Sequence, residues 1–327
     1  MQYKDNVYGS VDIDEPLIET LMHTPAVRRL QGVLQHGITG LIGITTPITR
    51  FDHSVGAMLL VRRLGGSLQE QVAALLHDVS HTAFSHVIDY VFDGHDSQSY
   101  HDEMKEQYLE QTELPTVLVD YGLNWRDFID EAKYPLLEQP APRLCADRLD
   151  YFLRDSLDLG LASEADVQDA LEHLVVHDGR IMVDNAEIAS WLAYTYLAAD
   201  MASWANLREV GLYELTARAI RRALHIDLIQ PSDFWRTDEE LWRVLQQSDD
   251  AAIQRELALV NTETVFTIAE DDPTFLVSTK IRSIDPEIVS PEGTVTPLSE
   301  IDRQFAAERR NYHRQREGQW PVRVIAA

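Results

Sequence analysis

Apolar residues recur at three- and four-residue intervals through most of this 327-residue chain, the spacing of helices that bury one face. An irregular segment at 38–48 interrupts the spacing, because glycines, threonines and Pro47 break the helical pattern. Thr24-Pro25 resembles a helix cap followed by proline at the first helical position. The predicted helices in this part of the chain are 16–21, 26–35, 54–64, 68–76, one after His86 that stops at Gly94, and one from His101 to about Glu110.

The second half of the chain adds further helices, one hairpin and a β-rich tail. Pro140 is expected to begin a helix that continues to Asp155. Asp178-Gly179 stands between β-branched runs and predicts a type I′ hairpin over 174–183. Beyond about residue 260, β-rich pieces at 264–268 and 275–281 alternate with prolines and predict a small α+β appendage. Helices are also predicted at 186–207, 208–229, 237–247 and 249–259, so the fold class is mainly α.

The helix predicted at 68–76 runs directly into a group of polar side chains. His77, Asp78, His81 and His86 follow one another within ten residues, and all are possible metal ligands or proton carriers. An unpaired polar group at the buried end of a helix costs about 1–3 kcal/mol, so these side chains need partners. A divalent cation would satisfy several of them together.

A second polar stripe lies on the helix predicted at 140–155. Its members lie at three- and four-residue spacing on one face, which should line a cavity or meet water: Asp147, Asp150, Tyr151, Arg154 and Asp155. We consider His53, His77, Asp78 and Asp147 as one ligand set. Two imidazoles and two carboxylates neutralise a divalent ion and leave positions open for water and a phosphate oxygen, as in catalytic sites. These ligand types do not determine which ion binds, and the candidates are Mn, Fe, Zn, Co, Ni and Mg.

Composition and net charge limit the partners and the cellular compartment that we expect for this protein. The hydrophobic share of 45% is ordinary for a globular protein, and the net charge of −26, from 28 basic and 54 acidic residues, makes nucleic acid an unfavourable partner. Such a charge could suit a salty cytoplasm, where screening relieves self-repulsion. The single Cys145, the lack of an apolar leader at the N-terminus and the lack of about 18 consecutive apolar residues favour a cytoplasmic protein outside the membrane.

Three sequence blocks carry a family resemblance. TRFDHSVG at 49–56 resembles R-F-E-H-S-x-G, HDVSHTAFSH at 77–86 resembles H-D-x-G-H-x-P-F-S-H, and DRLDYFLRD at 147–155 resembles D-x-x-D-Y-x-x-R-D. Together they resemble the HD-domain metal-dependent phosphohydrolase superfamily, in the branch of the SAM-and-HD-domain deoxynucleoside triphosphate triphosphohydrolases. The match runs from about residue 25 to 160, and 280–286 is similar to a tail motif. Ser80 and Ala83 replace the usual glycine and proline, which affects the fine shape of the pocket.

The resemblance implies a role for each matching residue. The metal ligands would be His53, His77, Asp78 and Asp147. The residues that would line the phosphate channel and transfer protons are His81, His86, Asp89 and His101. The residues that would contact the phosphate or the sugar of the substrate are Gln35, Arg50, Arg148, Tyr151 and Asp155.

The resemblance also implies an HD-type helical core at 1–230 and a C-terminal appendage at 231–327. The expected activity is metal-dependent hydrolysis of a nucleotide or a related phosphate ester or anhydride, with a dNTP as the first substrate to test. The alternatives are a two-metal phosphodiesterase or oxygenase, which would recruit His86 and His101, and a nucleotide-binding regulator without turnover. The expected partners are a small phosphorylated substrate and further copies of the chain.

Overall fold

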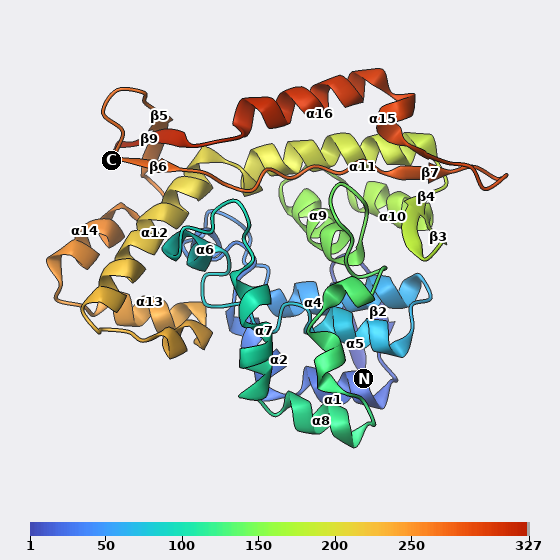
Figure 1. The fold of residues 1–327 in the computed structure, drawn as a ribbon, viewed down its shortest axis with the longest axis horizontal. Helices are drawn as coiled ribbons and strands as arrows, with labels where there is room; N and C mark the ends of the chain where they lie inside the picture. Colours follow the sequence, from blue (N-terminus) through green and yellow to red (C-terminus); the bar gives the residue numbers. More distant parts are fainter. Residues whose placement is uncertain (326–327) are drawn as a thin grey trace.

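The computed structural model describes residues 1–325 and shows a mainly helical molecule, as predicted (Figure 1). Helices α4 (Arg50–Arg63), α5 (Leu68–Leu76) and α9 (Ala146–Asp158) pack together and carry the polar blocks. The first apolar cluster surrounds them, and it also includes α1 (Pro16–Met22), α8 (Leu114–Asp120) and α11 (Ala186–Ala199). These contacts place the side chains of the separate sequence blocks at one point.

A second apolar cluster lies beside the first. It is built on α12 (Leu207–His225), which packs against α6 (Val87–Val91) and α14 (Ala251–Leu259). Helix α13 (Asp238–Gln246) closes this cluster, with Thr237 and Glu240 forming the predicted capping box. Further helices within residues 1–172 are α2 (Pro25–Arg29), α3 (Ile38–Leu41), α7 (Tyr100–Glu110) and α10 (Glu164–Glu172).

Three small sheets lie around the helices. Strands β1 (Gln2–Asp5) and β2 (Gly9–Asp12) form an N-terminal hairpin. The predicted hairpin, β3 (Leu174–His177) and β4 (Arg180–Val183), continues into β7 (Glu287–Val289) and β8 (Val295–Pro297). In the third sheet, β9 (Trp320–Ile325) lies between β5 (Val265–Ile268) and β6 (Phe275–Val277).

The C-terminal part of the chain returns to the helical core. Residues 278–286, called the connecting segment below, link β6 to β7 and run beneath α16 (Arg303–Arg316) in Figure 1. Helix α15 (Leu298–Ile301) contacts α11, and the ring of Phe305 packs against Tyr194 at a centroid distance of 5.5 Å. Ile284, Leu298 and Phe305 therefore belong to the first apolar cluster.

Several predicted boundaries are wrong for local reasons. The helix predicted at 26–35 ends at Arg29 and continues only as a 3-10 turn to Gly32, because the N–H of Gln35 instead donates to Ile48 O at 2.8 Å. The helix predicted from Pro140 begins at Ala146. The helix predicted at 186–207 ends at Ala199 and passes into a π-helical turn, Asp200–Trp204. The β1–β2 hairpin and α16 were not predicted.

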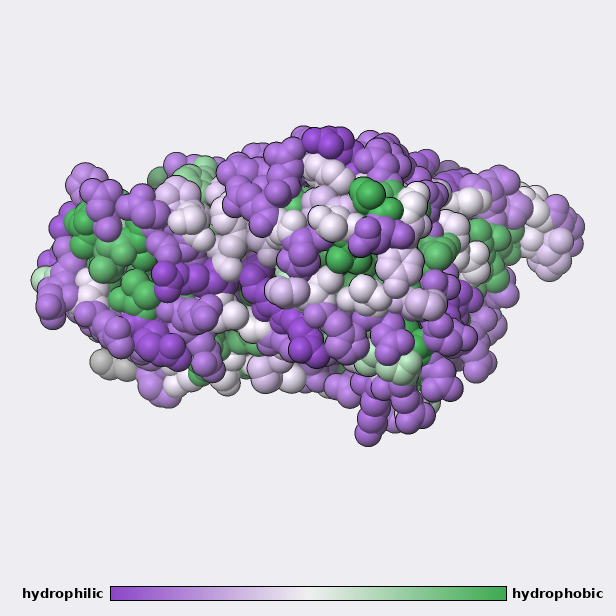
Figure 2. All heavy atoms as spheres, turned by 90° about the horizontal axis from the view of Figure 1, so that it is seen from below, coloured by the Kyte–Doolittle hydropathy of each residue, from purple (hydrophilic) through white to green (hydrophobic). Residues whose placement is uncertain are grey.

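The surface agrees with the composition. Hydrophilic residues cover most of the face shown in Figure 2, and apolar residues gather in small groups. Among the helices of residues 1–325, none combines the length and the apolar content needed to span a bilayer.

Candidate metal centre

Four side chains from three helical segments bring their donor atoms to one point. His53 Nε2 lies 3.0 Å from Asp147 Oδ1 and 3.1 Å from His77 Nε2. His77 Nε2 lies 3.4 Å from Asp147 Oδ1 and 3.5 Å from Asp78 Oδ1, and His53 Nε2 lies 3.7 Å from Asp78 Oδ2. The four residues predicted as ligands are therefore neighbours in space, although up to 94 positions separate them in the sequence.

The second nitrogen of each imidazole is already engaged. His53 Nδ1 lies 2.7 Å from Asp150 Oδ2, and His77 Nδ1 lies 2.7 Å from Ala74 O. A carboxylate or carbonyl partner fixes the proton on Nδ1 and leaves the lone pair of Nε2 for a metal, as is usual for ligating histidines. Both lone pairs then point to the position shared with Asp147.

A buried ion-pair chain holds Asp150 in place. Arg154 donates to Asp150 through Nε at 2.8 Å and to Asp5 Oδ2 at 2.7 Å. The β1–β2 hairpin thereby supports His53 through Arg154 and Asp150. Gly56 makes room for this chain, because a Cβ atom there would lie 1.9 Å from an Arg154 nitrogen and 2.1 Å from Asp150 Oδ1.

The two carboxylates at this point favour a positive charge beside them, which is supplied either by protons on the imidazoles or by a metal ion bound in their place. Burial would raise the pKa of Asp147, but hydrogen bonds from His53 and His77 hold that pKa well below its usual range. Burial likewise opposes ionisation of Asp78, yet Arg50 and the histidines keep its pKa well below normal. Burial lowers the pKa of His77, and the carboxylates of Asp78 and Asp147 outweigh this and raise it to about 10.

The donor set fits a divalent ion. Metal–ligand bonds of about 2.0–2.2 Å place neighbouring nitrogen and oxygen ligands about 3 Å apart, which is close to the separations among these four side chains. Two ionised carboxylates balance the charge of such an ion, and two imidazole nitrogens complete a mixed N/O set. His53, His77, Asp78 and Asp147 therefore fit a divalent metal.

Three further histidines lie next to the cluster. The rings of His81 and His101 are stacked with centroids 3.9 Å apart, and His86 lies edge-on to both. Neither ring nitrogen of His81 makes a hydrogen bond within residues 1–325, although Nε2 lies 3.2 Å from Asp78 Oδ1. Burial and the nearby Arg50 hold the pKa of His81 well below normal. His86 Nδ1 lies 3.1 Å from Asp89 Oδ2, so Asp89 fixes the orientation of His86.

The residues predicted to meet substrate line one cavity of about 530 Å³. Arg50 donates to Asp78 Oδ2 at 2.7 Å and to Ser85 Oγ at 3.0 Å. Arg148 is held by the Arg143 carbonyl at 2.6 Å and by Glu138 at 3.4 Å. Gln35 also lines the cavity, as do Tyr151 and Asp155. His53 and Asp89 lie behind its wall.

The end of the cavity near Tyr151 is aromatic. Tyr151 contacts Tyr196 through their hydroxyls and packs edge-on against Trp204 at a centroid distance of 5.0 Å. Asp155 accepts a hydrogen bond from Trp204 Nε1 at 2.6 Å. This end offers aromatic surface beside fixed polar groups, the composition of a typical small-molecule site.

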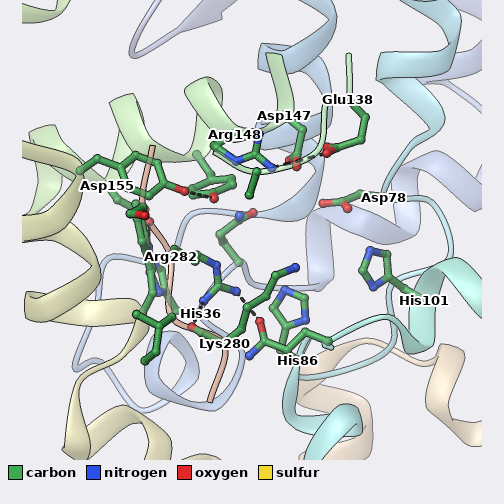
Figure 3. A pocket seen from close by; sticks show the side chains of 18 of the residues that line it. His36, Asp78, His86, His101, Glu138, Asp147, Arg148, Asp155, Lys280 and Arg282 are labelled. Atoms are coloured by element: carbon green, nitrogen blue, oxygen red, sulfur yellow. Dashed lines mark hydrogen bonds and ion pairs between the residues drawn. The ribbon is translucent and has the colours of Figure 1, made fainter. Parts of the chain in front are cut away.

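The sequence reasoning missed several residues that line the cavity. His36 lies 3.0 Å from Asp155 and 3.7 Å from Glu209. Lys280 and Arg282 point into the cavity from the connecting segment (Figure 3). Only the similarity of 280–286 to a tail motif could have identified the last two, and no pattern around His36 or Glu209 indicated a site.

Comparisons with known proteins were made for both sequence and fold. The HD domain family matches residues 50–155. The metal-dependent phosphohydrolase cns2 of Cordyceps militaris is 39% identical over 94% of this chain and 91% of its own length. YdhJ of Bacillus subtilis is 38% identical, covering 88% of each chain. The deoxynucleoside triphosphate triphosphohydrolase SAMHD1 of Danio rerio is 24% identical over 51% of this chain and 35% of its own.

Among solved structures, a phosphohydrolase of Bacteroides thetaiotaomicron superposes on this chain with a TM-score of 0.69. The superposition covers 100% of both chains at 17% sequence identity. At that identity the comparison establishes a shared fold.

Proposed function

Because the chain belongs to the HD-domain family of metal-dependent phosphohydrolases, we propose that its substrate is a nucleotide, with a deoxynucleoside triphosphate as the first candidate. One observation carries the proposal: a single cavity, lined by the proposed metal ligands His77, Asp78 and Asp147, extends to the aromatic end at Tyr151, Tyr196 and Trp204. A nucleotide has matching ends, because its phosphates are anionic and its base is flat and aromatic. The similarity to SAMHD1 supports the triphosphate as the first substrate to test.

The side chains around the cluster can stabilise the negative charge and transfer the protons that hydrolysis requires. A bound divalent ion would polarise a phosphoryl oxygen and acidify a water molecule. Arg50 is positioned beside Asp78 to offset negative charge on the phosphoryl group. His86 donates from Nδ1 to Asp89, which leaves Nε2 to accept a proton, and burial and Arg50 keep its pKa low.

At the other end, the polar groups are fixed for recognition. Asp155 is held by both Trp204 and His36, so its position is set before a ligand arrives. We assign Tyr151 and Asp155 to the nucleoside and Gln35 to the adjoining sugar or phosphate. Gln35 Oε1 is buried without a hydrogen bond among the described residues, so it can accept one from a ligand.

A metal-supplemented panel of dNTPs, NTPs, nucleoside monophosphates and cyclic nucleotides tests the proposal. Release of tripolyphosphate, pyrophosphate or orthophosphate identifies the bond that is cleaved. His77→Ala and Asp78→Ala should abolish both bound metal and turnover, whereas His177→Ala, in the β3–β4 hairpin, should retain both. Turnover of other phosphate esters with no nucleotide cleaved would reject the nucleotide assignment.

A second candidate function, a two-metal phosphodiesterase, is favoured by a second cluster. Asp78, His81 and His101 offer ligand atoms within 4.8 Å of one another, and Asp78 also adjoins the first cluster. If the two clusters each held an ion, the pair would supply Lewis-acid activation to both the attacking and the leaving oxygen of a phosphodiester. Elemental analysis of the number of metal ions per chain distinguishes the candidates. One ion in the parent protein that is retained in His101→Ala supports the nucleotide hydrolase. Two ions in the parent protein and one in His101→Ala support the two-metal phosphodiesterase.

We also propose that the chain forms a homo-oligomer through the sheet of β5, β9 and β6. Four large apolar side chains of this sheet are about half exposed among the described residues: Val265 at 54%, Ile268 at 50%, Leu276 at 54% and Ile325 at 49%. Val265 and Ile325 are cross-strand partners, so their side chains share a face. Light scattering should show an assembly that Leu276→Asp dissociates, and a monomeric parent protein would reject this proposal.

A further inference from the structure

Lys280 and Arg282, the two cations of the connecting segment, have no carboxylate partner in the part of the chain that the structure describes. Three other cavity-lining cations each have one: Arg50 lies 2.7 Å from Asp78, Arg148 lies 3.4 Å from Glu138, and Arg309 lies 3.2 Å from Asp285. Within residues 1–325, the side-chain nitrogens of Lys280 and Arg282 have no carboxylate oxygen within 4.0 Å. This distinguishes the pair from the other lysines and arginines that line the cavity.

The connecting segment is firmly held. The N–H of Arg282 donates to Asp200 Oδ2 at 3.1 Å, and the N–H of Asp285 donates to Pro142 O at 2.9 Å. Ser283 Oγ lies 2.7 Å from His313 Nε2 and accepts from Arg309 Nε at 2.9 Å, both on α16. The backbone that carries the two cations is therefore tied to three other parts of the molecule.

The guanidinium of Arg282 is also fixed. It donates to Gln98 Oε1 and, at 3.2 Å, to Lys280 O. Lys280 makes no side-chain hydrogen bond within residues 1–325, and its side chain is exposed and lines the cavity. One cation is thus pre-positioned and its neighbour can adjust to a ligand, a combination suited to anion binding.

The pair lies between the two ends of the cavity. Enclosure and the charge of Arg282 lower the pKa of Lys280, while the carboxylate of Asp147 at the metal cluster opposes this. Burial would lower the pKa of Arg282, but Tyr151, Asp200 and Tyr196 raise it, and the two tyrosines belong to the aromatic end. In Figure 3 both side chains lie below Asp147, with Asp155 to the left and Asp78 to the right.

Two neighbouring positive groups in a confined cavity repel each other. An anion bound between them would replace this repulsion with two attractive interactions. We propose that Lys280 and Arg282 form an anion subsite for a second phosphoryl group of the substrate, between the metal ligands and the aromatic end. The proposal rests on the proposed function, and it defines the substrate class as compounds with at least two linked phosphates. Orthophosphate has only one phosphoryl group, which the proposed metal ligands would hold.

Calorimetric titration of the metal-loaded protein with inorganic tripolyphosphate and with orthophosphate tests the subsite. Each charge-assisted contact contributes about 1.5–3 kcal/mol, so Lys280→Met and Arg282→Gln should each weaken tripolyphosphate binding about tenfold or more. Orthophosphate binding should change less than about threefold on the same scale. Lys280→Arg keeps the positive charge and should retain most of the tripolyphosphate affinity that Lys280→Met loses. Arg310→Gln, on the exposed face of α16, is the matched control.

The outcomes separate this inference from the proposed function. Unchanged tripolyphosphate affinity in Lys280→Met and Arg282→Gln, or equal losses for both anions, would overturn the subsite even if the protein hydrolyses nucleotides. A selective loss of tripolyphosphate binding in a protein that cleaves no nucleotide would support the subsite and reject the nucleotide. Circular dichroism of each variant ensures that a loss reflects the site and not unfolding.

Discussion

His53 has two ring nitrogens with different tasks. Nε2 faces His77 and Asp147, whereas Nδ1 faces Asp150, which lies one turn along α9 from Asp147. Asp147 and Asp150 therefore hold opposite sides of one imidazole. Of these two carboxylates, only Asp147 lines the cavity, so Asp150 acts through His53 as a positioning residue.

Asp150→Asn should lower the metal affinity about 10- to 100-fold, the usual effect of removing such a partner of a ligating histidine. The amide keeps the size of the side chain but removes the charge that orients Nδ1–H. Equilibrium dialysis with elemental analysis measures the affinity. Asp158→Asn, exposed near the end of the same helix, is the control, and equal metal affinity in both variants would contradict this role.

His36 predicts a pH dependence of stability. Burial lowers its pKa, but Asp155 and Glu209 outweigh this and raise it to about 10. A pKa above the unfolded value of about 6.5 means that protonation stabilises the folded state. This contribution is fully present below about pH 6.5 and is lost as the pH rises through the folded pKa.

His36→Gln should therefore lower the free energy of unfolding more at pH 6.5 than at pH 10.5, by more than about 1 kcal/mol. Urea unfolding of the parent protein and the variant at several pH values measures this difference. His225→Gln, at an exposed position of α12, is the control for the loss of a histidine. A pH-independent effect of His36→Gln would show that His36 is neutral in the folded protein.

Where possible ligands recur at fixed spacing, the sequence alone indicated residues that the structure brings together, although their roles stay predictions. His77 and Asp78 were identifiable because an apolar helix ends in polar groups, and the structure brings them to Asp147. The roles assigned to His81, His86 and His101 stay predictions, although all three line the cavity. His36 and Lys280 could not be derived from spacing, because folding alone brings distant segments to the same wall.

At the scale of elements, α4 depends on its first turn. Thr49 accepts a hydrogen bond from the N–H of Asp52 at 3.1 Å, and Asp52 accepts one from the N–H of Thr49 at 3.3 Å. This capping box sets the start of the helix just before Arg50 and His53. The predicted start at residue 54 was wrong because the capping box lies within the polar block at 49–53, which was read as the end of an irregular segment.

Thr49→Ala should lower the free energy of unfolding by about 1 kcal/mol, the usual cost of losing a helix cap. It should also weaken metal binding, because fraying of this turn moves His53. Ser163→Ala removes the same type of capping box from α10 and should cost similar stability without affecting metal binding. Equal metal affinity in the two variants would show that the cap does not position the site.

Elements beyond residue 260 were predicted least well. The short β-rich pieces were confirmed at β5 and β6, but α16 has few apolar residues and gave no clear helical pattern. Its buried side is limited to Phe305 and Ala306, and its polar side chains hold the connecting segment. Tertiary contacts, which a local pattern cannot show, therefore decide this part of the fold.

At the scale of the whole molecule, the proposed division at residue 230 stays a prediction. The first apolar cluster includes Ile284, Leu298 and Phe305 from beyond that residue, and the second joins α6 to α13 and α14. The C-terminal part also supplies Lys280 and Arg282 to the cavity. The appendage and the core therefore share both packing and the site.

The net charge of −26 predicts that salt stabilises the protein. Acidic side chains are closer together in the folded state than in the unfolded chain, so their repulsion opposes folding and screening relieves it. The screening length falls from about 30 Å at 0.01 M salt to about 8 Å at 0.15 M and about 3 Å at 1 M. Most of the rise in the thermal unfolding midpoint should therefore occur below about 0.3 M KCl.

The shape of this curve distinguishes screening from other effects of salt. Exclusion of a salt from the protein surface grows steadily with concentration, and uncharged sucrose reproduces it without screening. Calorimetry in KCl and in sucrose of equal osmolality should show the early rise only in KCl. An unfolding midpoint that does not change between low and molar KCl would mean that opposite charges, such as Arg154 with Asp5 and Asp150, already offset the repulsion locally.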